Sequence, residues 1–170
     1  MLYFFATLGV VFVGLFLLLA FTWKNGMSPM PTKRGVKEAL LEHLPDLERG
    51  TVVELGSGWG NLLFPLSKKY ETCSVIGYEN SPIPYLVSSI LNHKNNLQIF
   101  RKDFYEKSLQ EANLVVCYLF PKGMDRLREK LERELKPGTK VVSHTFEIPN
   151  WTPSKTIKAE SSTIFLYEVT

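Results

Sequence analysis

Three alternating glycines directly follow a short apolar segment, and they constrain the fold more than any other feature of the sequence. The segment runs from Thr51 to Leu55, and the stretch after it reads Gly-Ser-Gly-Trp-Gly-Asn from Gly56 to Asn61. Glycines let the backbone turn sharply and approach a ligand closely. The dinucleotide fingerprint requires Gly or Ala where this chain has Asn61, and there is no Gly-Lys-Ser/Thr for a phosphate-binding P-loop. The stretch therefore predicts a strand, a ligand-binding turn and a helix, with a turn of no function as the alternative.

Apolar segments alternate with amphipathic ones along the chain. Such alternation predicts an α/β fold with a mostly parallel sheet and helices on both of its faces. Ligands bind these sheets beyond the carboxyl ends of the strands. Ser81 and Pro82 open one of the helices, because Ser suits the N-cap and Pro the first helical position. The predicted strands are 51–56, 73–79, 97–104, 112–120 and 139–146, the other helices are 32–44, one ending near 70 and 121–136, and a hairpin covers about 155–169.

The N-terminal stretch from Leu2 to Trp23 contains no charged residue. A helix of about 20 apolar residues spans the hydrocarbon core of a bilayer. We therefore predict a transmembrane anchor at residues 1–24, a Gly- and Pro-containing linker at 25–31 and a folded domain at 32–170. A cleaved targeting signal and a buried core helix are the alternatives. Because Lys24, Lys33 and Arg34 follow the run, the positive-inside rule places the domain on the cytoplasmic or mitochondrial matrix-equivalent side of the membrane.

Charge and cysteine content argue against two classes of partner. The net charge of +3 comes without a basic run or an interleaved aromatic stripe, so a nucleic acid partner is not expected. Cys73 and Cys117 lie in apolar segments without the spacing of metal ligands, so neither a metal site nor a disulfide is expected. Unpaired cysteines agree with a reducing compartment.

The glycine stretch together with the acidic residue before it reads Glu-x-Gly-x-Gly-x-Gly from Glu54 to Gly60. This pattern resembles motif I of the class I S-adenosylmethionine-dependent methyltransferases. The resemblance implies a Rossmann-like sheet and a site for the amino-acid end of S-adenosylmethionine. A carboxylate suits the ammonium group of that ligand, whereas it would repel a pyrophosphate. The residues assigned to this part of the cofactor site are Glu54, Gly56, Ser57, Gly58, Gly60 and Asn61.

Acidic residues also follow the second and third predicted strands. Glu79, with Asn80 beside it, ends the second strand, where a carboxylate can accept hydrogen bonds from both ribose hydroxyls. The resemblance to class I methyltransferases implies that Asp103 accepts from the adenine amino group and that the backbone of Phe104 meets a ring nitrogen. A solvated charge at Glu79 and a cap or turn role for Asp103 are the alternatives.

The aromatic residues Tyr118 and Phe120 follow the fourth predicted strand, where these enzymes present the methyl group to its acceptor. Core packing is the alternative role. A closer resemblance extends over Leu-Phe-Pro-Lys-Gly-Met at 119–124, Leu-Lys-Pro-Gly at 135–138 and Val-Val-Ser-His-Thr-Phe-Glu-Ile-Pro-Asn-Trp at 141–151. These stretches are similar to the lysine methyltransferases that modify the mitochondrial adenine nucleotide translocase and the c-type subunit of ATP synthase. The resemblance implies protein-lysine methylation and spans nearly the whole chain.

Tyr118 is the predicted catalytic residue, because it would position the lysine amine, and Phe120, His144 and Trp151 are the predicted substrate-binding residues. His144 could assist proton removal, or it could be a hydrogen-bonded residue at a strand end. Only about ten residues separate the fifth strand from the hairpin, so the sheet is shortened there and no lid is available for a small acceptor. We therefore expect a protein acceptor, possibly membrane-embedded. A lipid or small amine at the membrane, and a non-catalytic cofactor-binding scaffold, are the rival interpretations.

Overall fold

The computed structural model describes residues 32–160 and 162–170, together with residues 1, 3–5, 7–9, 12, 14 and 16. The predicted linker at 25–31 and most of the predicted anchor at 1–24 lie outside the described residues. Within the part of the chain that is described, no helix combines the length and apolar character needed to cross a membrane.

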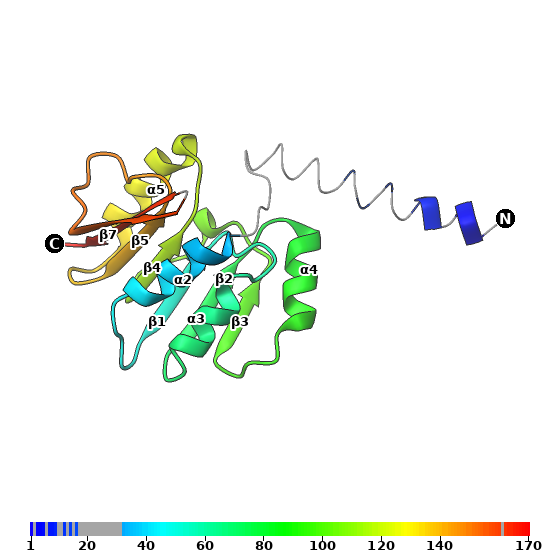
Figure 1. Cartoon of the computed structure of the whole chain (residues 1–170), viewed down its shortest axis with the longest axis horizontal. Coiled ribbons are helices and arrows are strands. Elements are labelled where there is room, and N and C mark those ends of the chain that lie inside the picture. The colour runs from blue at the N-terminus through cyan, green and yellow to red at the C-terminus, as the bar shows by residue number, and fades with distance from the viewer. Residues whose placement is uncertain are drawn as a thin grey trace.

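Among the described residues, seven strands form one sheet in the order β3-β2-β1-β4-β5-β7-β6 (Figure 1). Strands β1 to β5 pair in parallel, whereas β7 is antiparallel to both β5 and β6. The mostly parallel α/β sheet predicted from the sequence is confirmed. The strands are β1 Thr51–Leu55, β2 Ser74–Tyr78, β3 Leu97–Phe100, β4 Leu114–Cys117, β5 Lys140–His144, β6 Lys155–Ala159 and β7 Ser162–Glu168.

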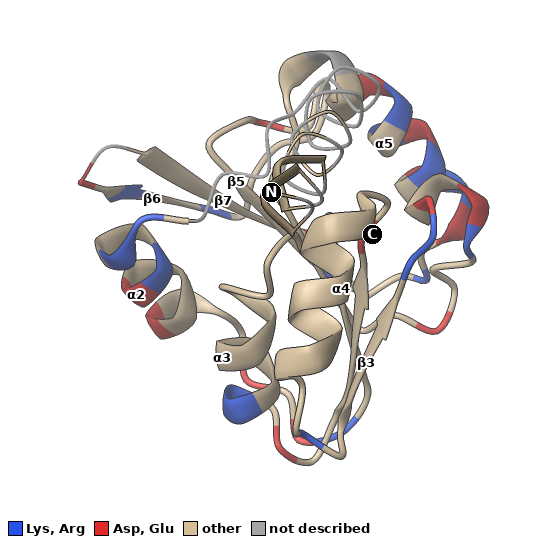
Figure 2. Cartoon of the chain, turned by 90° about the vertical axis from the view of Figure 1, so that its right-hand side faces the viewer, with Lys and Arg blue, Asp and Glu red and all other residues tan. Residues whose placement is uncertain are grey.

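Helices cover both faces of this sheet, as predicted. In Figure 2, α2, α3 and α4 lie in front of the sheet and α5 lies behind it. No helix occurs in the described residues 145–154, so the shortening after the fifth strand is also confirmed. The helices are α2 Arg34–His43, α3 Leu63–Lys69, α4 Pro82–Leu91 and α5 Pro121–Glu134, with a short 3-10 helix, η1, at Phe104–Glu106.

Two apolar clusters lie on opposite faces of the sheet because successive strand side chains point to opposite sides. Val52 of β1 packs with α2 and α3, whereas Val53 of the same strand packs with α5. The two valines of β4, Val115 and Val116, divide between the clusters in the same way. Burial on both faces explains why these strands read as continuous apolar runs in the sequence.

Two predicted strands are shorter than the sequence indicated. The third was predicted to reach residue 104 but ends at Phe100, and the fourth was predicted to reach residue 120 but ends at Cys117. The reason lies in the pairing. Phe100 is the partner of Tyr78, and Cys117 is the partner of Leu55, which are the last residues of β2 and β1. Beyond these pairs the neighbouring strands have ended, so the ladder stops and loops begin.

A buried ion pair fixes the segment between β3 and β4 to α5. The ammonium of Lys130 lies 2.7 Å from a carboxylate oxygen of Glu134 and also donates to the carbonyls of Tyr105 and Lys107. Glu134 in turn accepts from the backbone N–H of Leu109. Removing one member of such a pair leaves an uncompensated buried charge and costs about 3–5 kcal/mol. The network therefore holds the loop that carries Asp103 and Phe104 in place.

Candidate active site

The parallel register brings the predicted ligand-binding loops to one edge of the sheet. Leu55 is paired with both Tyr78 and Cys117, and Cys117 is paired with Ser143. The loops after β1, β2, β4 and β5 therefore leave the sheet beside one another. All predicted site residues except Trp151, Asp103 and Phe104 lie within three residues of these strand ends or in the glycine turn.

The glycine turn is anchored on the neighbouring strand by backbone hydrogen bonds. The N–H groups of Gly56 and Ser57 both donate to the carbonyl of Tyr78, at 2.9 and 3.0 Å. One residue further, the N–H of Gly58 donates to Oε2 of Glu79 at 2.8 Å. The turn after β1 is thus built directly onto the end of β2, which is where the ribose-binding carboxylate was predicted.

The three glycines have different structural roles. Gly56 and Gly58 have φ of 77° and 52°, and a Cβ built on either would meet nothing within 4 Å. Gly60 has φ of 83°, but a Cβ there would lie 2.6 Å from the ring of Phe64. The first two therefore present open backbone to a ligand, whereas the third allows the turn to pack on α3. The sequence pattern alone did not separate these roles.

Glu79 is buried and holds two loops together. Its Oε1 accepts from the N–H of Ser81 at 2.6 Å, and its Oε2 accepts from Gly58. Ser81 is the N-cap residue of α4 and Pro82 its first residue, as predicted. A carboxylate has about four lone-pair positions, so both oxygens can still accept from a ligand. The alternative of a solvated charge at Glu79 is wrong, because the side chain is not exposed.

Glu54 is a buried carboxyl with an unsatisfied oxygen. Its Oε2, like the hydroxyl of Ser57, has no hydrogen-bond partner among the residues that the structure describes. Burial, and secondly the negative charge of Glu79, raise the pKa of Glu54 well above its usual value. An unpaired buried polar group costs about 1–3 kcal/mol. A cationic ligand group beside Glu54 would remove this cost and favour the ionised carboxylate.

The alternative role foreseen for Asp103 is observed. Its carboxylate caps η1 by accepting from the N–H of Tyr105 at 3.0 Å. Phe104 is half-buried, and its ring lies 4.3 Å from that of Tyr105. A contact between adenine and Asp103 or Phe104 stays a prediction, as do the roles of Asn61, which is exposed, and of Asn80, which is half-buried.

Four aromatic rings gather beyond the ends of β4 and β5, and we call them the aromatic cluster: Tyr118, Phe120, His144 and Phe146. The ring of Tyr118 lies 4.5 Å from that of His144 and 6.4 Å from that of Phe146. Phe120 is 43% exposed and lies 5.8 Å from Phe146. The sequence prediction missed Phe146, although the residue belongs to the Ser-His-Thr-Phe stretch that carried the family resemblance. Tyr118 and Phe120 therefore line the site edge rather than the interior of the core.

His144 is a neutral imidazole at the last position of β5. Burial lowers its pKa to about 4, so the ring carries no charge near neutral pH. Its Nε2 is buried and has no hydrogen-bond partner within the described part of the chain. A base with so low a pKa cannot hold a proton taken from an alkylammonium group. The ring nitrogen is instead suited to accept a hydrogen bond from a neutral amine.

The backbone beside His144 is strained. Thr145 has φ of 74°, a conformation that a β-branched residue rarely adopts. Its N–H donates to the carbonyl of Thr163 at 2.7 Å, and the hydroxyl of Ser143 donates to the carbonyl of Phe146 at 2.5 Å. Strain of this kind costs about 1–3 kcal/mol and tends to occur at functional sites. Here it turns the chain so that Phe146 returns to Tyr118.

Trp151 belongs to a different part of the molecule. Its indole N–H donates to Glu132 of α5 at 3.0 Å, and its ring meets Tyr167 of β7 edge-on at 5.8 Å. These contacts fix the segment after β5 against α5 and β7. The predicted substrate-binding role of Trp151 is not supported by a contact with the aromatic cluster among the described residues.

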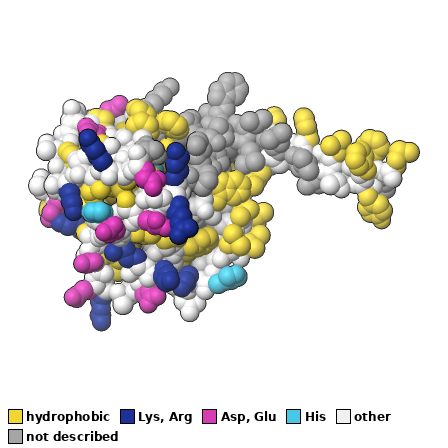
Figure 3. Space-filling model, viewed as in Figure 1, with side chains coloured by type: hydrophobic (Ala, Val, Ile, Leu, Met, Phe, Trp, Pro, Cys, Tyr) yellow, Lys and Arg dark blue, Asp and Glu magenta, His cyan; other side chains and the backbone are white. Residues whose placement is uncertain are grey.

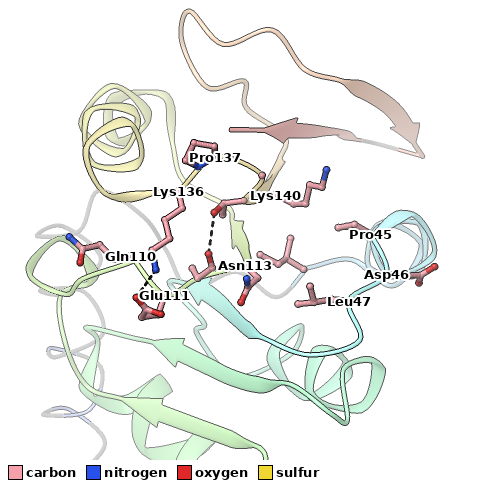
Figure 4. Close-up of a pocket in the computed structure, with 13 residues that line it drawn as sticks. Pro45, Asp46, Leu47, Gln110, Glu111, Asn113, Lys136, Pro137 and Lys140 are labelled. Carbon is pink, nitrogen blue, oxygen red and sulfur yellow. Dashed lines mark hydrogen bonds and ion pairs between the residues drawn. The ribbon is translucent and has the colours of Figure 1, made fainter. Parts of the chain in front are cut away.

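A separate cavity of about 350 Å³ lies at the opposite edge of the sheet (Figure 4). Its lining includes Asn113, Leu114 and Lys140, which stand at the beginnings of β4 and β5. An ion pair of 2.7 Å between Lys136 and Glu111 lies in its wall. Because the predicted site residues are at the carboxyl ends of these strands, this cavity is not their binding site.

Comparison with known proteins identifies the site. A family model described as the ANTKMT methyltransferase domain matches residues 54–155. A protein-lysine N-methyltransferase from Saccharolobus islandicus is 33% identical over 82% of this chain and 92% of its own length. The human lysine N-methyltransferase that acts on the c-type subunit of ATP synthase is 28% identical over 71% of this chain and 52% of its own. The chain thus spans about half of that human relative.

A crystal structure gives the same assignment. The RNA methyltransferase from Salinibacter ruber, solved with S-adenosyl-L-homocysteine, superposes with a TM-score of 0.75 at 27% identity, over 82% of this chain and 94% of that one. Fold and site together define a class I S-adenosylmethionine-dependent methyltransferase. Within this class, the chain belongs to the family of the ANTKMT methyltransferase domain.

The residues at the site edge fit S-adenosylmethionine. Gly56 and Gly58 leave open space along the backbone, where the amino-acid end of the cofactor can lie. The unpaired oxygen of Glu54 suits its ammonium group, and the unpaired hydroxyl of Ser57 offers a further hydrogen bond. Glu79 has acceptor capacity left for the ribose hydroxyls.

Cofactor binding should release a proton from Glu54. The carboxyl is protonated in the free enzyme because its pKa is raised, and the ammonium group of the cofactor lowers that pKa again. The observed affinity should therefore rise with pH until the pKa of the free enzyme is passed. Titration calorimetry in two buffers of different ionisation enthalpy measures the released proton. Glu54→Gln should abolish the release and weaken binding by about 1.5–3 kcal/mol. Equal heats in both buffers for the wild-type enzyme would contradict this assignment.

Proposed function

We propose that this enzyme transfers methyl groups from S-adenosylmethionine to lysine side chains of a membrane-embedded protein, with the acceptor amine held at the aromatic cluster. The observation that carries the proposal is the position of Tyr118 and the uncharged His144 at the edge that also bears the glycine turn. Relatives named as lysine methyltransferases, one of them specific for an ATP synthase subunit, support the choice of acceptor. The rival acceptors are a lipid or a small amine.

The chemistry requires positioning rather than a covalent nucleophile. Bound S-adenosylmethionine supplies an activated methyl group on a sulfonium sulfur. Glu54, Ser57 and Glu79 would hold the cofactor at the glycine turn, while Tyr118 and Phe120 enclose the amine. Correct orientation of two reactants can supply about 7–11 kcal/mol of the barrier.

The lysine amine must be neutral, and the aromatic cluster favours that form. An apolar environment lowers the pKa of an amine because it disfavours the charged state. The unpaired Nε2 of His144 can accept a hydrogen bond from the amine and so direct its lone pair. Because the pKa of His144 is about 4, the imidazole does not keep the proton. The proton leaves to solvent instead, past Phe120, which is partly exposed.

We also propose that residues 1–24 anchor the enzyme in a membrane through the linker at 25–31. The uncharged run from Leu2 to Trp23 supports this part of the proposal. The basic residues Lys24, Lys33 and Arg34 support a cytoplasmic or matrix-equivalent side for the domain at 32–170. Tethering raises the effective concentration of a membrane-embedded acceptor.

The class of acceptor can be measured directly. The purified full-length enzyme is incubated with methyl-tritiated cofactor and membranes from cells that lack it, and protein, lipid and RNA are then counted separately. We expect the label in protein, recovered after acid hydrolysis as N-methyllysine. Gly58→Val serves as the blank, because a side chain there enters the cofactor space at a strained φ of 52°. Label that appears mainly in lipid or RNA would refute the lysine acceptor.

Tyr118→Phe should lower single-turnover methyl transfer while cofactor affinity stays within about threefold, which is about 0.6 kcal/mol. The phenylalanine ring keeps the contacts with His144 and Phe146, and only the hydroxyl is lost. Tyr85→Phe, on α4 and outside the aromatic cluster, is the matched control. Wild-type turnover in Tyr118→Phe would leave the residue a packing role. Loss of cofactor binding would move it into the cofactor site.

A further inference from the structure

Helix α4 differs from the other long helices in having no charge. From Asn80 to Asn92 the sequence contains no acidic or basic residue. Figure 2 shows α4 facing the viewer without a charged side chain, whereas α2 and α5 carry both signs. Most helices on a protein surface carry charged residues on their solvent side, so the outer face of α4 requires an explanation.

The outer face of α4 is apolar as well as uncharged. Leu86, Ile90 and Leu91 are 56%, 65% and 55% exposed. Ile83, Leu86 and Ile90 follow the i, i+3, i+7 spacing of a single helix face. We call these four residues the α4 face. Figure 3 shows hydrophobic side chains gathered on the side of the domain where α4 lies in Figure 1. Contiguous exposed apolar surface of this kind marks an interaction site.

The α4 face adjoins the apolar N-terminal run. A Cβ built on Gly14 would lie 4.0 Å from the terminal carbon of Ile83. The N-terminal side chains that are described do not pack into the domain, because Phe4, Phe5, Phe12 and Phe16 are largely exposed. A helix that is apolar on all sides needs an apolar environment on all sides, and the α4 face could cover only one of them. A bilayer can cover both the run and the α4 face.

We propose that the α4 face rests on the lipid bilayer beside the N-terminal anchor and orients the domain on the membrane. The proposal depends on the membrane tether proposed above. Helix α4 begins directly after Glu79 and Asn80, so its N-terminal end is at the edge of the sheet that bears the candidate active site. Contact through α4 would bring this edge to the bilayer surface. The preferred acceptors are then lysines close to the headgroups rather than lysines far out in solution.

Fluorescence quenching by brominated lipids tests the contact. Full-length Ile90→Cys and Glu129→Cys, each labelled with a nitrobenzoxadiazole thiol reagent, are reconstituted into vesicles of phosphatidylcholine and phosphatidylglycerol. Glu129 is an exposed residue of α5 and provides the matched control. The native Cys73 and Cys117 are buried, and the wild-type chain gives the background label. An apolar helix face at a membrane lies about 5–10 Å into the headgroup boundary, within reach of bromine on the acyl chains.

We expect the label at position 90 to lose about half of its emission in brominated vesicles, and the label at 129 to lose almost none. Equal quenching at both positions, or none at either, would overturn the proposal. A blue-shifted but unquenched label at 90 would also overturn it, since the N-terminal run or a second copy would then cover α4.

A second measurement separates this inference from the proposed function. Leu86→Glu with Ile90→Glu should reduce labelling of membrane proteins at least fivefold, or by about 1 kcal/mol. Methylation of a detergent-solubilised extract of the same membranes should stay within about twofold of wild type. Equal activity on membranes and extract would refute the α4 contact alone. Failure of the wild-type enzyme to label protein in either preparation would refute the proposed function instead.

Discussion

The site depends on one constraint, which is the parallel register that ends β1, β2 and β4 at the same level. Leu55, Tyr78 and Cys117 are paired in this register, and the backbone N–H groups of Gly56 and Ser57 both donate to Tyr78. Every loop with a proposed role in the chemistry leaves the sheet at this level or is fixed beside it. The glycine turn therefore takes its shape from the neighbouring strand as well as from its own glycines.

The same edge of the sheet concentrates polar groups that the protein itself does not satisfy. Oxygens of Glu54 and Ser57 and the Nε2 of His144 are buried without a hydrogen-bond partner among the described residues. Each unsatisfied group costs about 1–3 kcal/mol, and Thr145 adds backbone strain beside them. The buried ion pair of Lys130 and Glu134 stabilises the adjoining loop. This contrast is expected of an enzyme, because ligands supply the missing hydrogen bonds.

The sequence predicted the order and type of the elements because strands buried on both faces read as unbroken apolar runs. It predicted too much strand after β3 and β4, since aromatic residues such as Phe104 and Phe120 extend the apolar pattern past the last paired residue. Single-residue roles depended on contacts between distant segments. The bond from Trp151 to Glu132 and the two N–H groups held by Glu79 could not be read from spacing. Phe146 was missed because its strained turn hides its direction.

A crystal structure of this enzyme with S-adenosylhomocysteine would test the central claim most directly, because it fixes the position of every cofactor group at once. The account predicts the amino-acid end against Gly56, Gly58 and Glu54, the ribose hydroxyls on Glu79, and the sulfur facing Tyr118. A ligand bound in the cavity at the opposite edge of the sheet, between Asn113 and Lys140, would contradict it. So would a sulfur directed away from the aromatic cluster.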